Sequence, residues 1–83
     1  MAPVHRALPF LLRICTAIET LFIVEVGPFG AQIAQDARVA WLATGNKTRP
    51  ADVLQYVALL AQHIDDDQRR DAFVAEARKC IHV

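Results

Sequence analysis

The sequence predicts an all-α protein, a compact bundle of four short antiparallel helices. Apolar residues recur at intervals of three and four in successive stretches, which is the period of an α-helix with one buried face. Hydrophobic residues make up 54% of the chain and many are alanines, which favour helix. No stretch alternates apolar and polar residues as a half-buried strand does. We therefore expect residues 1–83 to form a single domain, with residues 1–6 as a flexible tail.

The first predicted helix spans residues 8–26 and has a broad apolar face, wider than the usual stripe of a surface helix. The face comprises Leu8, Leu11, Leu12, Ile14, Cys15, Ile18, Leu21, Phe22, Ile23 and Val26. Such a helix is either central in the bundle or partly covered by a second copy. The same stretch contains Arg13, Glu19 and Glu25, and charges make a membrane span costly. We therefore expect a cytoplasmic protein without a membrane segment.

The second helix is predicted over residues 28–44, because proline suits a first helical turn and the preceding glycine suits a helix end. The third helix has Thr48 as its expected N-terminal cap and Pro50 in its first turn, and it runs to His63. Its predicted buried face comprises Val53, Leu54, Val57, Leu60, Ala61 and Ile64. The short connections favour antiparallel neighbours.

The fourth helix is predicted to begin at an acidic cluster, residues 65–67. Asp65 followed by Gln68 matches a capping box, and acidic side chains suit the positive end of a helix. The cluster lacks the spacing of a calcium loop, and the histidines are scattered, so we predict no metal site. Because no catalytic or nucleotide-binding motif is present, we expect neither an enzyme nor a cofactor.

Glu19 and Glu25 fall inside the apolar arc of the first helix, where a carboxylate needs a partner or a raised pKa. Arg70 is expected on the inner face of the fourth helix. We predict that Arg70 pairs with one of the two glutamates and fixes the register of the helices, with the choice between them left open. An acid–base pair or a ligand site is the alternative.

The chain carries two cysteines, Cys15 and Cys80, too few for a disulfide scaffold. We expect two free thiols in a reducing compartment, and a bond between them is the alternative that stays open if the first and last helices touch. The nine basic residues balance nine acidic ones, and this neutral charge argues against nucleic-acid binding.

Several large apolar residues exceed what so small a bundle can bury, which indicates an interface with a partner. The candidates are Leu21, Phe22, Ile23, Trp41, Tyr56 and Leu59. We therefore predict a non-enzymatic protein-interaction or self-association module, and specifically a homodimer. Two alternatives are a nucleic-acid-binding regulator using Lys47 and Arg49, and a small-molecule sensor with a pocket near Glu19 and Arg70.

Three motifs occur in order along the chain: residues 26–30 (VGPFG), residues 54–64 (LQYVALLAQHI) and an acidic turn followed by Arg70 and Phe73. This pattern resembles a small helical domain of unknown function that is found in bacterial signalling proteins, often C-terminal to serine/threonine kinase or other regulatory domains. The resemblance covers residues 12–77, and Gly30 stands where that family usually has alanine. It implies a regulatory or interaction module without catalytic residues.

Overall fold

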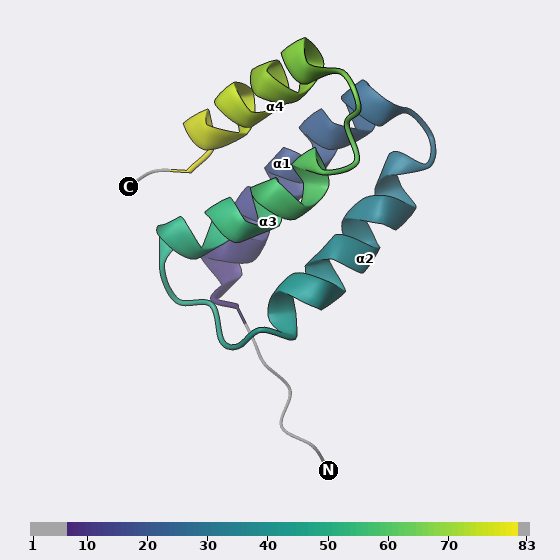
Figure 1. The fold of residues 1–83 in the computed structure, drawn as a ribbon. Helices are drawn as coiled ribbons and strands as arrows, with labels where there is room; N and C mark the ends of the chain where they lie inside the picture. Colours follow the sequence, from purple (N-terminus) through teal and green to yellow (C-terminus); the bar gives the residue numbers. More distant parts are fainter. Residues whose placement is uncertain (1–6, 82–83) are drawn as a thin grey trace.

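The computed structural model describes residues 7–81 of the chain (Figure 1). It contains four α-helices and a short 3-10 helix: α1 (Pro9–Val26), α2 (Gly30–Leu42), η1 (Pro50–Asp52), α3 (Val53–Ala61) and α4 (Asp67–Lys79). Successive α-helices run in opposite directions. The predicted all-α bundle is therefore confirmed. The tail predicted for residues 1–6 lies outside the described residues.

The helices α1 and α3 form the centre of the bundle, and α2 and α4 lie on either side of them (Figure 1). Each central helix packs against both flanking helices and against the other central helix. The broad apolar face predicted for the first helix is thus explained by the central position of α1 in the bundle. In the part of the chain that is described, no helix has both the length and the apolar character needed to cross a bilayer.

The core consists of one stripe from each helix. On α1 the fully buried residues follow one another at intervals of four, three and four, and they are Leu11, Cys15, Ile18 and Phe22. Aromatic rings join the helices, with centroid distances of 5.7 Å for both Phe22–Phe73 and Trp41–Tyr56. These contacts connect α1 to α4 and α2 to α3, so all four helices share one core.

The turn between α1 and α2 depends on glycine. Gly27 has a φ of 85°, a backbone conformation that few other residues adopt, and its N–H donates to the carbonyl of Ile23 at 2.8 Å. The N–H of Gly30 then donates to the carbonyl of Gly27 at 2.9 Å. Pro28 and Phe29 therefore belong to the turn, and α2 begins two residues later than the sequence predicts.

Neither predicted N-cap is correct: Asp66 caps α4 in place of Asp65, and Arg49, not Thr48, precedes η1. The N-cap of α4 is Asp66, whose Oδ1 accepts from the backbone N–H of Arg69 at 2.9 Å, whereas Asp65 was expected. Before α3, the Asp52 carboxylate accepts from the backbone N–H groups of Thr48 and Arg49 at 3.1 and 3.0 Å. These hydrogen bonds lower the pKa of Asp52.

Candidate functional site

Three of the six predicted interface residues lie in the core. Phe22, Trp41 and Tyr56 are 0–1% exposed, so the expectation that they form a free apolar surface is wrong. Their polar atoms find partners inside the chain: Trp41 Nε1 donates to the carbonyl of Asp52 at 2.8 Å, and the Tyr56 hydroxyl donates to the carbonyl of Ala34 at 3.4 Å. Because these contacts satisfy the indole and the phenol, both rings can be fully enclosed.

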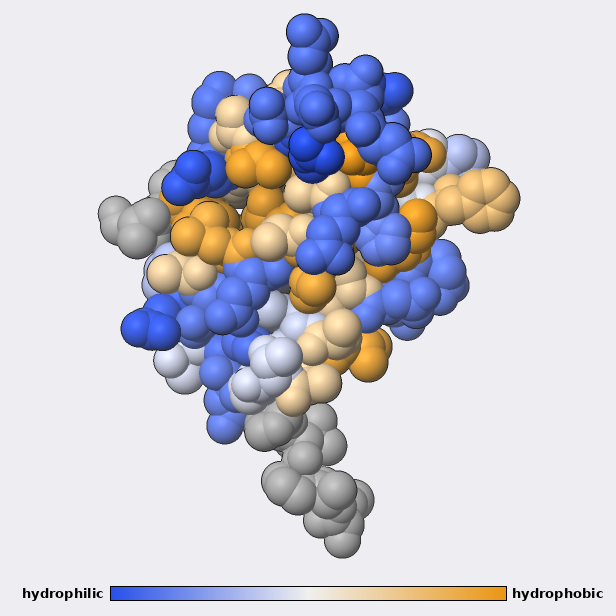
Figure 2. All heavy atoms as spheres, in the orientation of Figure 1, coloured by the Kyte–Doolittle hydropathy of each residue, from blue (hydrophilic) through white to orange (hydrophobic). Residues whose placement is uncertain are grey.

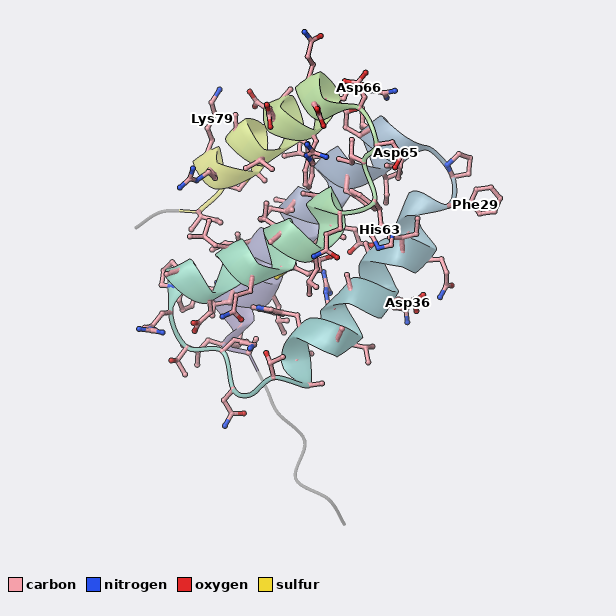
Figure 3. All side chains as sticks on the ribbon, in the orientation of Figure 1. Phe29, Asp36, His63, Asp65, Asp66 and Lys79 are labelled. Carbon is pink, nitrogen blue, oxygen red and sulfur yellow. The ribbon has the colours of Figure 1, made fainter. Side chains whose placement is uncertain are left out.

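Leu21, Ile23 and Leu59 are half-buried, and their role in an interface stays a prediction. Leu21 and Leu59 pack against the core with part of each side chain exposed. Among residues 7–81, the most exposed large apolar side chains are Val24 and Phe29, each 79% exposed. Phe29 projects away from the bundle at the turn between α1 and α2 (Figure 3).

The two glutamates of α1 pair with arginines other than the predicted one. Glu19 binds Arg38 of α2, with 3.1 Å between Oε2 and the guanidinium. Glu25 binds Arg69 of α4 at 2.9 Å, and its backbone carbonyl accepts a second hydrogen bond from the same guanidinium at 2.7 Å. Arg70 instead pairs with Asp67, one turn away on its own helix.

The predicted pocket near Glu19 and Arg70 does not form, because the two side chains lie in different hollows. Glu19 lines a hollow of about 320 Å³ with Arg38 and Val39, beside α2. Arg70 lines the larger groove between α3 and α4. The sensor hypothesis therefore loses the site on which it was based.

The half-buried Glu19 and Arg38 form a polar cluster with the buried Cys15 and Tyr56, between α1, α2 and α3. The guanidinium carbon of Arg38 lies 5.9 Å from the centroid of the Tyr56 ring. Burial raises the pKa of Cys15 to about 11 and that of Tyr56 to about 12. The Cys15 thiol is thus protonated at neutral pH and is a poor nucleophile. This cluster has the character of internal packing and not of a catalytic site.

The stability of the domain is expected to fall as pH rises from about 9 to about 12. The pKa values of Cys15 and Tyr56 are higher in the folded chain than in the unfolded chain. Their contribution to folding stability is therefore complete below about pH 9. It is lost at higher pH because both groups ionise first in the unfolded chain. Each group accounts for about 2–3 kcal/mol of this loss. Tyr56→Phe should make the free energy of unfolding depend less steeply on pH between pH 10 and 12.

Tyr56 is the single tyrosine, so its ionisation can be followed directly by ultraviolet absorbance. The midpoint should lie well above pH 10 in the folded protein and near 10 in concentrated urea. Equal midpoints in the two solutions would contradict the buried position of the phenol.

The loop before α3 offers little to a nucleic acid. Lys47 is only 5% exposed, and its ammonium group donates to Thr44 and Gln55 and lies 5.5 Å from the centroid of the Trp41 ring. Arg49 is exposed but lies 3.4 Å from the carboxylate of Asp52. Since phosphate binding requires accessible cations, these contacts weaken the nucleic-acid hypothesis.

A groove of about 760 Å³ runs between α3 and α4 and is open to solvent along its length. Its lining is apolar in the middle and polar at the ends, and comprises Leu54, Ala58, Ala61, Gln62, Arg70, Asp71, Val74, Ala75 and Arg78. Figure 2 shows it facing the viewer, with apolar atoms in the hollow and hydrophilic α4 atoms above. Because α3 and α4 are antiparallel, Leu54 lies at the Arg78 end and Gln62 at the Asp71 end.

The groove is not evident from the sequence. The third helix is predicted to bury Leu54, yet this residue is 37% exposed. The signal was a second stripe on α4, in which Asp71, Val74, Ala75 and Arg78 repeat at helical spacing beside the buried Phe73 and Ala77. On a short helix such a stripe is easily taken for ordinary surface.

Cys15 and Cys80 are both free thiols, as expected. Within residues 7–81, no three His, Cys, Asp or Glu side chains are grouped so that they could hold a metal ion. The groove between α3 and α4 is therefore the candidate site, and its lining suits binding through apolar contact more than chemistry on a substrate.

These features define a class, the small all-α domains with an open, largely apolar groove between two helices. The chain belongs to the family of a domain of unknown function, DUF8082, whose model matches residues 14–82. The predicted resemblance to a small helical domain of unknown function agrees with this match. Comparisons with curated proteins and with solved structures find no match.

Proposed function

We propose that the domain is a non-enzymatic protein-interaction module, and that its groove between α3 and α4 binds an apolar-faced helix of another protein chain. The observation that supports this is the groove itself, which has small apolar side chains in its middle and charged ones at its ends. A helix laid in a groove buries its apolar face and leaves its polar face in water.

The shape of the groove favours a helix over a small molecule. Sites for small molecules enclose most of the ligand surface, whereas this groove is open along one side. Ala58 and Ala75 project no more than a methyl group from α3 and α4, so a third helix can approach both closely. The resemblance to domains of bacterial signalling proteins supports a regulatory setting, in which such binding would join the domain to a partner.

Site-specific photocrosslinking in the cells that make the protein tests this function. Benzoylphenylalanine in place of Gln62, at one end of the groove, should yield a discrete adduct that maps to one helical segment of one protein. Adding Ala58→Arg, which fills the groove, should reduce the adduct at least about tenfold, equivalent to about 1.4 kcal/mol.

The matched control places the same crosslinker at Ala31, an exposed position of α2 away from the groove. It should give no such adduct. The proposal fails if position 62 gives no more adduct than position 31, or if the adduct survives Ala58→Arg in a folded protein.

A further inference from the structure

The groove side of α4 has an opposite charge at each end and apolar side chains between them. It consists of Asp71, Val74, Ala75 and Arg78, which share one helix face. The two charges are seven positions apart in the sequence, so they lie about 10 Å apart along the helix axis. Such a face is complementary to its own copy turned end for end, since each negative end then meets a positive end.

Among residues 7–81, Asp71 and Arg78 are also the groove charges that have no partner. Within residues 7–81, neither side chain forms a hydrogen bond or an ion pair. The other basic side chains of α4 are already paired, as Arg69–Glu25, Arg70–Asp67 and Lys79–Glu76. Asp71 and Arg78 can therefore pair across an interface without breaking a contact to another residue of this described range.

We infer that the helix bound in the groove is α4 of a second copy, an inference that rests on the proposed function. The two α4 helices lie antiparallel about a two-fold axis between Val74 and Ala75. Asp71 of each copy then pairs with Arg78 of the other, and the apolar side chains meet at the axis. The small side chain of Ala58 leaves room for this approach.

The charges determine the direction of packing. If the two helices lay parallel and in register, Asp71 would face Asp71 and Arg78 would face Arg78, which is repulsive at both ends. Antiparallel packing replaces both repulsions with attractions. Because the ion pairs lie at the ends of the groove, near water, their main effect is on orientation and partner choice, and the apolar contact supplies most of the affinity.

A charge-reversal experiment tests the pairing. Asp71→Arg alone would place two arginines at each end of the dimer, and Arg78→Asp alone would place two aspartates there. Each single variant should dimerise about tenfold more weakly than the natural sequence. An equimolar mixture of the two variants restores both ion pairs and should form a heterodimer with near-natural affinity, as measured by sedimentation equilibrium over a dilution series.

The control mixture combines Asp36→Arg and Arg13→Asp, exposed positions on α2 and α1 that do not line the groove. These variants carry the same charge changes and should dimerise as the natural sequence does, alone or mixed. Circular dichroism confirms that every variant is folded.

Two results would overturn the inference. The first is a natural sequence that is folded and yet remains monomeric at about 1 mM, which corresponds to a binding free energy weaker than about −4 kcal/mol. That result would exclude the second copy as the occupant of the groove. A dimer that tolerates both single reversals would place the interface elsewhere. In either case an adduct from Gln62 to a helix of a different protein would leave the proposed function intact, whereas no adduct at all would remove both.

Discussion

Trp41→Ala is expected to leave the domain largely unfolded at 25 °C. Trp41 is 1% exposed and packs on Tyr56, and its indole N–H donates to the carbonyl of Asp52 at 2.8 Å. Truncating a buried tryptophan costs about 3–5 kcal/mol, and the carbonyl left without its donor adds about 1 kcal/mol. Domains of this size are at the lower end of the usual 5–15 kcal/mol of stability, so this loss removes most of it.

Urea unfolding followed by circular dichroism measures the effect. Val39→Ala on the same helix is the matched control, because Val39 is 66% exposed and should change the free energy of unfolding by less than about 0.5 kcal/mol. If Trp41→Ala loses no more stability than Val39→Ala, the tryptophan is not part of the core.

Gly30→Ala should have the second largest effect, a loss of about 1–3 kcal/mol. A methyl group on Gly30 would lie 2.9 Å from the backbone Cα of Ile23 and 2.8 Å from Cγ2 of Val26. The Val26 side chain can rotate, but the backbone of α1 cannot move without shifting the whole helix. The substitution therefore pushes α1 and α2 apart where they cross.

Whether Gly30→Ala raises or lowers the free energy of unfolding is informative. Alanine favours helix over glycine by about 1 kcal/mol and would stabilise α2 if space allowed. Ala31→Gly, at the next position and exposed, is the control and should lose at most about 1 kcal/mol through propensity alone. A rise in the urea midpoint for Gly30→Ala would show that the crossing of α1 and α2 is looser than the structure has it.

The apolar surface that is open to a partner lies in the groove between α3 and α4. Phe22, Trp41 and Tyr56 are enclosed in the core, whereas the groove between α3 and α4 is lined partly by small side chains such as Ala58 and Ala75. Substitution of Phe22 or Trp41 would test folding and would reveal nothing about partners. Variants in the groove test partner binding without removing the core.

The local sequence defines the helices. Their periodic apolar residues, the glycine–proline step after α1 and the acidic start of α4 predict four helices with nearly correct limits, because hydrogen bonding and side-chain spacing within a helix are local. It also determined that Glu19 and Glu25 need cationic partners, since both fall on an apolar face. A carboxylate in that position has the same need in any arrangement of the bundle.

The identity of those partners depends on how the helices pack against one another. Arg38, Arg69 and Arg70 all lie on neighbouring helices, and the choice among them depends on the register between helices, which local spacing does not contain. The enclosure of Trp41 and Tyr56 likewise depends on carbonyl groups that other segments bring to their polar atoms. The groove exists because α4 packs through the narrow stripe of Phe73 and Ala77 and leaves its neighbouring face uncovered, a consequence of how two helices cross and not of either helix alone.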